Sequence, residues 1–209
     1  MAETALSKEI IKLLKEAGFS QVYLRNCGDN FYSFSKALAD AVDYNEFGPF
    51  VDKQSPGELH QRGAVAFLSR DKRAGVAVWP DGNIRAVFKD SRSKNNGAIG
   101  ELMLTALQAG GKKLDCFDGF LSGAYAQFGF IPVCRIKFSK DFAPENWKTK
   151  FGNPDIIFWR HCGDDVQTVA KNLTTYKLYT KKELHQLPCF DSYDEACKYR
   201  DEKMGMSQN

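Results

Sequence analysis

The sequence lacks the features that mark secreted, membrane-spanning and nucleic-acid-binding proteins. No apolar run among its 209 residues reaches the roughly 18 residues typical of a membrane-spanning helix. The opening Met1-Ala-Glu-Thr has no charged segment followed by an apolar one, so we expect no signal peptide, no membrane partner and a cytoplasmic protein. The net charge is only +3 and there is no basic run, which argues against nucleic acid as a partner.

Cysteine and histidine are present, but not at the spacings that bind metal. The six cysteines include no C-x-x-C pair, and there are three histidines. Tetrahedral zinc sites take their ligands at short, regular spacings, so we predict no metal ion. Cys116 and Cys134 lie in apolar, strand-like runs, where a free thiol behaves as a small buried apolar group. We therefore expect reduced thiols.

The composition is that of a globular protein rich in phenylalanine. Apolar residues make up 43% of the chain and charged residues 26%, values typical of a soluble domain. The 16 phenylalanines predict an aromatic core or cleft. The length fits one sizeable domain, with or without appendages.

Apolar periodicity and turn residues divide the chain into expected elements. The expected helices cover residues 7–17, 33–42, 100–108 and 120–128. The expected strands cover residues 21–25, 64–68, 75–79, 84–88, 113–117, 132–138 and 155–159. Residues 43–63 predict a long loop with one helical turn. Two capping boxes, at 180–183 and 192–195, predict short C-terminal helices, and residues 194–204 predict a charged helix in solvent.

The order of these elements predicts the fold class. After a leading helix it reads β-α-β-β-β-α-β-α-β-β, in which antiparallel hairpins at 64–88 run into a β-α-β segment. This order predicts an α/β (α+β) fold: a mixed, mostly antiparallel central sheet flanked by helices, with a helical C-terminal extension. We expect three parts, covering residues 1–20, 21–160 and 161–209.

The junction between the strand at 84–88 and the helix at 100–108 has the composition of an anion-binding turn. It contains Asn95-Asn-Gly-Ala-Ile-Gly100, preceded by Arg92 and Lys94. Glycine lets backbone approach a ligand closely, and free N–H groups at a helix start bind phosphate. The segment is neither a Walker loop nor G-x-G-x-x-G, and Asn and Gly also occur in such loops for turn geometry alone.

A second junction follows the strand at 113–117. A short helix leads to Tyr125-Ala-Gln-Phe-Gly129-Phe130, where Gly129 fits the residue that ends the helix. Tyr125 lies one turn before that end. Its ring would either pack in the core or face a cleft.

Together the two junctions resemble the GNAT-type acyl-CoA N-acyltransferase superfamily. In that family a Gln/Arg-x-x-Gly-x-Gly/Ala turn holds the CoA pyrophosphate through backbone amides, and Asn95 to Gly100 falls on this pattern. A later Asn followed by Tyr-x-x-x-Gly-Phe is matched by Asp118 and by Tyr125 to Phe130. The resemblance covers residues 21–160. Asn95, Ala98 and Asp118 depart from the family's usual residues.

The resemblance implies a GNAT-like domain that binds acetyl-CoA or another acyl-CoA as co-substrate. The implied cofactor-binding residues are Phe88, Arg92, Lys94, Asn95, Asn96, Gly97, Ala98, Ile99, Gly100 and Asp118. The sheet is expected to splay between the strands at 84–88 and 113–117, so that free backbone groups pair with the pantetheine arm.

The resemblance also implies a reaction, N-acyl (most simply N-acetyl) transfer to a small-molecule or peptide amine. The amine attacks the thioester directly in a ternary complex. A backbone N–H near Phe88 would stabilise the oxyanion, and Tyr125 would protonate the departing thiolate. We expect Asp90 as general base, with Glu58 and His60 as alternatives, and residues 43–63 as the substrate wall.

Two other functions remain open from the sequence. The chain could keep the GNAT fold and act as a non-catalytic interaction or regulatory module, with an aromatic surface and a charged C-terminal helix. A nucleic-acid-associated factor is supported only by the isoelectric point near 8.4. The sequence leaves the acceptor and the oligomeric state open.

Overall fold

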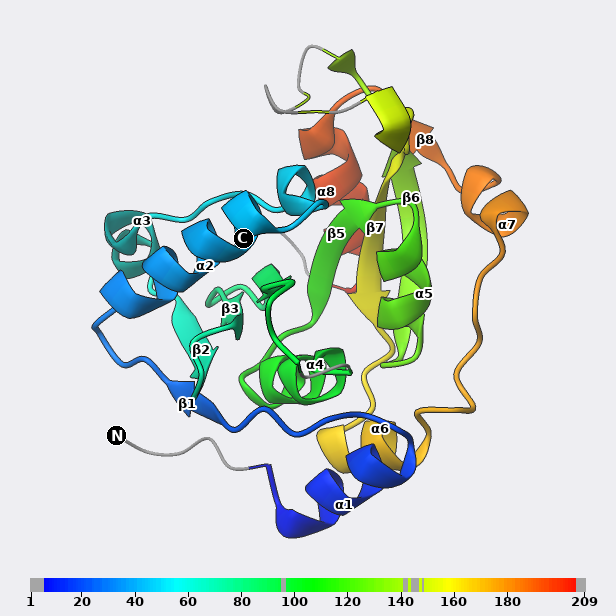
Figure 1. Ribbon diagram of the computed structural model, residues 1–209. Coiled ribbons are helices and arrows are strands. Elements are labelled where there is room, and N and C mark those ends of the chain that lie inside the picture. The colour runs from blue at the N-terminus through cyan, green and yellow to red at the C-terminus, as the bar shows by residue number, and fades with distance from the viewer. Residues whose placement is uncertain (1–5, 95–96, 141–142, 144–146, 148, 206–209) are drawn as a thin grey trace. The chain divides into compact units, whose positions relative to one another are not determined.

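The computed structural model describes residues 6–94, 97–140, 143, 147 and 149–205, and these divide into two compact units (Figure 1). The first unit comprises residues 1–112 and 165–173, and the second comprises residues 113–164 and 174–209. These bounds differ from the expected parts 1–20, 21–160 and 161–209. Each unit has its own sheet and helices.

The first unit is a meander of strands with helices packed on it. Its helices are α1 (Lys8–Glu16), α2 (Tyr32–Tyr44), the 3-10 turn η1 (Gly48–Phe50), α3 (Pro56–Gln61), α4 (Ile99–Gln108) and α6 (Val166–Lys171). Its strands are β1 (Leu24–Asn26), β2 (Val65–Ser69), β3 (Ala74–Val78) and β4 (Ile84–Lys89). They form an antiparallel sheet in the order β1-β2-β3-β4.

The core of the first unit lies on both faces of this sheet. All five residues of β3 are buried. Phe34 and Leu38 of α2 pack against one face, in a cluster that includes Ala77 and Phe88. Because side chains alternate along a strand, Val76 points to the other face, and α4 also contacts β3. An apolar strand between two helices explains why the hydrophobic run at 74–78 has no polar alternation.

A β-bulge interrupts β4, which is an edge strand of the first sheet as the described residues form it. Ala77 pairs with Arg85. Two residues earlier on β3, Gly75 pairs with Phe88, three residues beyond Arg85. One extra residue is therefore accommodated in β4, and Ala86 adopts a left-handed φ of 51° there. Left-handed alanine is uncommon, so the surrounding pairing must hold it in place.

The second unit has a mixed sheet. Its strands are β5 (Lys113–Phe117), β6 (Phe130–Ile136), β7 (Ile156–His161) and β8 (Cys189–Phe190), in the order β5-β7-β6-β8. Its helices are α5 (Phe120–Ala126), the 3-10 turn η3 (Thr149–Phe151), α7 (Lys181–His185) and α8 (Tyr193–Lys203). Strand β7 is antiparallel to β5 and β6, and β8 is parallel to β6.

The C-terminal helix α8 is held by a buried charge network. Lys113 Nζ on β5 lies 2.9 Å from Asp201 Oδ2 on α8. The Tyr193 hydroxyl donates to Asp115 at 2.7 Å, and Arg200 is only 1% exposed. The expected charged helix at 194–204 is present as α8, and Asp194, Glu195, Lys198, Glu202 and Lys203 are exposed. Of its charged side chains, only Arg200 and Asp201 face β5, where they lie beside Asp115 and Lys113.

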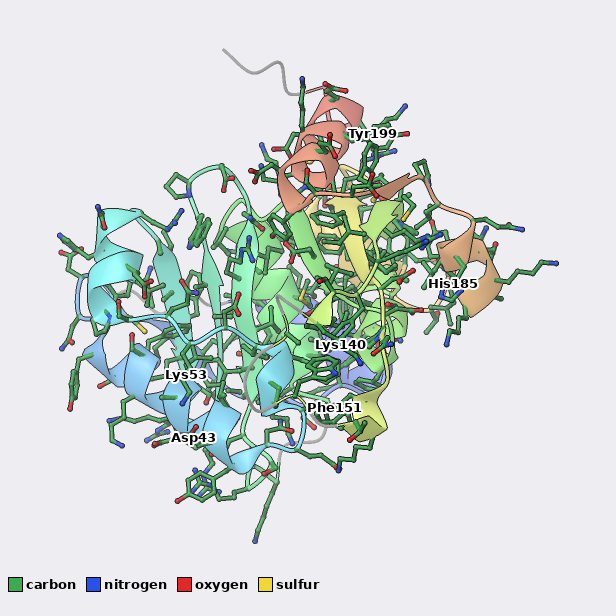
Figure 2. The ribbon with its side chains drawn as sticks, turned by 90° about the horizontal axis from the view of Figure 1, so that it is seen from above. Asp43, Lys53, Lys140, Phe151, His185 and Tyr199 are labelled. Carbon is green, nitrogen blue, oxygen red and sulfur yellow. The ribbon has the colours of Figure 1, made fainter. Side chains whose placement is uncertain are left out.

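The mixed α+β class is confirmed, but the single central sheet is not what the described residues form: they form two four-stranded sheets. The strand at 113–117 was predicted to the residue. The loop at 43–63 contains two helical segments, η1 and α3, and an ion pair between Asp43 and Lys53 at 2.7 Å spans the first of them (Figure 2). Helix α6 and strand β8 were not expected.

Candidate functional site

The turn after β4 is built around a buried carboxylate. Asp90 is 2% exposed and accepts hydrogen bonds from the backbone N–H of Arg92 at 2.8 Å and from its Nε at 2.9 Å. The Arg92 guanidinium also forms an ion pair with Asp90 through Nη2. Arg73 donates from Nη1 to the Arg92 carbonyl at 2.7 Å. The turn is thus closed by its own side chains, as in other Asp-initiated turns.

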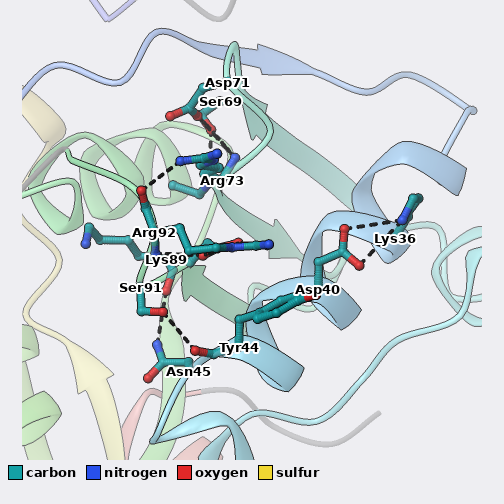
Figure 3. Close-up of polar contacts among 12 residues, drawn as sticks. Lys36, Asp40, Tyr44, Asn45, Ser69, Asp71, Arg73, Lys89, Ser91 and Arg92 are labelled. Atoms are coloured by element: carbon teal, nitrogen blue, oxygen red, sulfur yellow. Dashed lines mark hydrogen bonds and ion pairs between the residues drawn. The ribbon is translucent and has the colours of Figure 1, made fainter.

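The same turn is fixed to the C-terminal end of α2, within the first unit (Figure 3). The Ser91 hydroxyl donates to the Tyr44 carbonyl at 2.8 Å, and the Asn45 side-chain amide donates to the Lys89 carbonyl at 3.1 Å. The Arg92 guanidinium lies 3.7 Å from the centre of the Tyr44 ring. These contacts hold Arg92 in one orientation.

Four cationic residues lie in or beside this turn: Arg73, Lys89, Arg92 and Lys94. Lys94 is exposed, and Arg92 keeps 44% of its side chain accessible although it is paired. The only carboxylate within the turn segment 90–94 is Asp90, whose charge is opposed by Arg92. The turn therefore presents an excess of positive charge.

Asp90 was expected to act as a general base, and its surroundings make it a weak one. The hydrogen bond from Arg92 lowers the pKa of Asp90 below its ordinary value. A carboxylate with a lowered pKa and its oxygens already hydrogen-bonded has little tendency to take a proton at neutral pH. The geometry gives Asp90 the role of shaping the turn.

The end of the turn leads into α4 through a left-handed glycine. Gly97 has a φ of 85°, and Ala98 occupies the N-cap without a side-chain hydrogen bond to the first turn. Gly100 N–H reaches the Gly97 carbonyl at 3.3 Å, a long hydrogen bond. A cap without a side-chain acceptor leaves first-turn N–H groups available to a ligand. Asn95 and Asn96 lie outside the described residues.

Both glycines also have a packing role. A Cβ on Gly100 would lie 2.6 Å from Cγ of Phe19, and one on Gly97 would lie 3.1 Å from the Ser20 nitrogen. The glycines therefore let the start of α4 lie directly against the segment between α1 and β1. From the sequence, we explained these glycines by the close approach of a ligand. The structure shows a second reason, which is close packing against Phe19 and Ser20.

Glu101, which the sequence did not single out, is the most connected residue of the α4 start. Its carboxylate is 5% exposed and accepts backbone N–H groups from Val22 at 2.6 Å, Tyr23 at 3.3 Å and Leu24 at 3.0 Å. One charged residue within the apolar run Ile99-Gly-Glu-Leu-Met-Leu104 was the available signal, because a buried carboxylate must find donors.

Phe88, expected near the oxyanion, is a core residue. Its ring packs edge-on against Phe34 with centroids 5.5 Å apart. The irregular backbone lies before it, at the Ala86 bulge. A bulge leaves backbone groups of the strand without ladder partners, and such sites often flank active sites. The backbone near Ala86 is thus a better candidate for an N–H donor than the regular pairing at Phe88.

In the second unit, Tyr125 is 5% exposed, and its ring packs edge-on against Phe130 at 6.4 Å. Burial raises the pKa of Tyr125 far above its ordinary value, so the phenol stays protonated. A protonated phenol can donate a hydrogen bond or a proton.

Asp118, the other expected contact in the second unit, lies at the start of the β5–α5 turn. Its backbone N–H donates to the Asp155 carbonyl at 2.7 Å, and its carboxylate lies 3.5 Å from Nε2 of His185 on α7. The α7 segment is therefore a neighbour of this side chain.

Two alternative bases lie on α3. Glu58 forms the capping box with Ser55, accepting its N–H at 2.7 Å, and this hydrogen bond lowers the pKa of Glu58. His60 is exposed near the end of the same short helix. Glu58 thus begins the helix, and the geometry gives it no sign of a catalytic role.

His161 and Cys162 place a thiol near an imidazole, but the pairing does not activate the thiol. His161 Nε2 lies 3.1 Å from the Phe128 carbonyl, and Nδ1 accepts the Gly163 N–H at 3.2 Å. A carbonyl can only accept, so Nε2 carries the proton and Nδ1 is occupied. Burial lowers the pKa of His161 and raises that of Cys162. This imidazole cannot serve as base for the thiol 3.9 Å away.

The expected residues therefore divide between the units. Asp90, Arg92, Lys94 and the turn from Gly97 to Gly100 belong to the first unit, whereas Asp118 and Tyr125 belong to the second. In the described part of the chain, all six cysteines are free thiols, and no three His, Cys, Asp or Glu side chains form a group that could hold a metal ion.

Comparisons with known proteins add nothing to these observations. No family model matches the chain, and searches of curated proteins and of solved structures gave no significant match. Across the described residues, no helix combines the length and apolarity needed to cross a membrane.

Proposed function

We propose that the protein is an acyl-CoA-dependent N-acyltransferase, most simply an N-acetyltransferase, with a GNAT-like fold. The observation that carries the proposal is the succession, within one unit, of the bulge in β4, the cationic turn at residues 90–94 and the start of α4 at residues 97–100. These parts offer, in order, a backbone donor, positive charge and helix N–H groups. An acyl thioester carried on a pyrophosphate-containing cofactor has groups that suit each of them.

The cationic turn supports the phosphate end of the proposal. Arg92 and Lys94 offer charge, and the uncapped first turn of α4 offers N–H donors. A pyrophosphate with two negative charges would be held by both. Arg92 is already oriented by Asp90 and Tyr44, so little side-chain entropy is lost on binding.

The bulge supports the thioester end. In the proposed reaction the amine nitrogen forms a bond to the acyl carbon, and the carbonyl oxygen becomes negatively charged. A backbone N–H released from the ladder near Ala86 would stabilise that oxygen. The C–S bond then breaks, and the leaving thiolate takes a proton, a role that the resemblance assigns to Tyr125 of the second unit.

We assign no side chain to take the proton from the amine. The acceptor attacks as the neutral amine and then releases its proton to solvent. Asp90 was the expected base, but its pKa is lowered by Arg92 and its oxygens are occupied. A neutral amine needs no strong base before attack, because its proton can leave after the C–N bond has formed.

Binding of CoA is the direct test. Thermal unfolding with millimolar CoA should show a raised melting temperature, because a ligand of the native state stabilises it by RT ln(1 + [L]/Kd). Lys94→Gln should weaken CoA binding about tenfold, the effect of roughly 1.4 kcal/mol from one phosphate contact. Lys8→Gln, which removes an exposed lysine from α1, serves as the matched control.

The outcomes separate the proposal from its alternative. No stabilisation by CoA would overturn the acyltransferase proposal and favour a non-catalytic module of the same fold. Equal weakening by Lys94→Gln and Lys8→Gln would show that CoA binds through general charge attraction and not at the turn.

A further inference from the structure

The buried carboxylate of Glu101 has an arrangement that a merely structural residue of α4 would not require. Glu101 is the third residue of α4 and is followed by the fully buried Leu102, Met103 and Leu104. An apolar residue in place of Glu101 would extend that core without the cost of desolvating a charge. The carboxylate must therefore supply something that apolar packing at this position cannot.

Its partners form an anion-binding loop of backbone. Three consecutive N–H groups, from Val22 to Leu24, converge on the two carboxylate oxygens. Consecutive N–H groups converge when one residue takes a left-handed conformation, and Tyr23 has a φ of 54°. The Tyr23 side chain is 60% exposed, so packing of the ring does not explain this backbone. The carboxylate is what holds it.

The same segment touches the glycines of the proposed phosphate turn. The backbone from Gly18 to Ser20 approaches Gly97, and the Phe19 side chain lies against Gly100. Residues 18–24 therefore contact the start of α4 at three successive places: Gly97, Gly100 and Glu101. A shift of this segment would move the turn with it.

The placement also removes an electrostatic conflict. A carboxylate in the first turn of a helix is stabilised by the helix dipole, but it competes with a phosphate for the same N–H groups. Here both oxygens of Glu101 are occupied by residues 22–24. The Glu101 carboxylate therefore does not compete for the N–H groups at the start of α4, of which the Gly100 N–H is bonded to the Gly97 carbonyl.

We infer that Glu101 is a positioning residue that locks the α1–β1 segment to the start of α4 and so sets the phosphate-binding turn. The inference rests on the proposed function, because it assigns Glu101 to the site that would bind the CoA pyrophosphate. Glu101 itself touches neither cofactor nor acceptor in this proposal.

The test compares two thioester probes. Acetyl-CoA carries the pyrophosphate, whereas S-acetyl-pantetheine has the same thioester arm without it. Affinities are measured by calorimetry for the first and by ligand-observed NMR for the second, at a temperature where circular dichroism shows each variant folded. Glu101→Gln should weaken acetyl-CoA binding at least tenfold and leave S-acetyl-pantetheine within twofold of wild type.

Further variants guard the interpretation. Glu16→Gln removes an exposed carboxylate from α1 and should leave both affinities within twofold. Tyr23→Gly keeps the left-handed backbone, which glycine adopts freely, and should also bind acetyl-CoA within twofold of wild type. If Glu101→Gln does not fold, Glu101→Asp keeps the charge on a shorter side chain and should weaken acetyl-CoA binding selectively by a smaller factor.

Three results would count against the inference. A folded Glu101→Gln or Glu101→Asp variant with wild-type affinity for acetyl-CoA would overturn it, as would equal weakening for both probes, which indicates general loosening. Loss of binding in Tyr23→Gly would assign the effect to the Tyr23 ring instead. A wild-type protein that binds no CoA overturns the proposed function itself, a different result from these.

Discussion

The two strand-to-helix junctions, β4 to α4 and β5 to α5, share a local plan and differ in charge. The first has four cationic residues in or beside it and three carboxylates: Asp90, which is paired with Arg92, and the neighbouring Asp40 and Asp71. The second begins with Asp118, whose carboxylate faces His185, and continues to Phe120, which is 87% exposed. Only the first junction has the charge to hold an anion. The second offers chemistry one turn later, at the Tyr125 phenol.

This comparison predicts that the two junctions affect different steps, and Tyr125→Phe tests the larger effect. Removing a general acid typically lowers turnover by about 100-fold or more. We expect that loss in thiol release from acetyl-CoA, with an amine acceptor found by screening, while CoA affinity stays within twofold. Tyr32→Phe, at an exposed tyrosine on α2, is the control. Unchanged turnover would remove Tyr125 from the reaction and leave the second junction without a role.

Glycine substitutions distinguish the junctions by stability. Gly100→Ala places a Cβ 2.6 Å from the Phe19 ring, near its attachment to the backbone, and overpacking of this kind costs about 1–3 kcal/mol. Gly123→Ala in α5 has nothing within 4 Å, so the better helix propensity of alanine should make it neutral or stabilising by about 1 kcal/mol. Urea unfolding measures both. Equal effects would mean that the α4 start is no more tightly packed than α5.

Asp90→Asn should give the smallest effect, with a defined dependence on pH. The hydrogen bond from Arg92 lowers the pKa of Asp90 in the folded state. Its contribution to stability is therefore present above the unfolded pKa, near 3.9, and is lost as the pH falls through the lower folded pKa. We expect the free energy of unfolding of wild type to exceed that of the variant by about 1 kcal/mol at pH 7, because Arg92 is partly exposed, and the difference should shrink as the pH falls through the lowered folded pKa. A difference independent of pH would exclude the charged pair as its cause.

The sequence predicted an element well where the element's own residues determine its bounds, without contacts from distant parts of the chain. Polar and apolar residues alternate along most of the strand at 113–117, which lies between turns that contain glycine. Its bounds were predicted to the residue. The strand expected at 21–25 begins instead at Leu24, because the preceding N–H groups bind Glu101, almost 80 residues away. No local pattern could indicate that contact.

The candidate site was predictable in composition but not in geometry. Arg92 and Lys94 beside a glycine turn were visible in the sequence, and the structure places all of them in the first unit. The left-handed Ala86 and the pairing of Asp90 depend on the register of β4 with β3 and on Arg92 folding back over the turn. Alanine carries no signal for a left-handed conformation, so the bulge could not be foreseen. The division into two sheets likewise depends on pairing between distant strands.

The position of helix α6 in the sequence affects how the first unit can fold during synthesis. It follows β7 of the second unit, yet it belongs to the first, where it contacts α1 and α4. During synthesis the first unit cannot assemble all its parts until the ribosome has passed Leu173, by which time β5, β6 and β7 have already been synthesised. A fragment that ends at Lys112 would leave the apolar surfaces beneath α6 uncovered. The cationic turn is therefore best studied in a chain that includes residues 165–173.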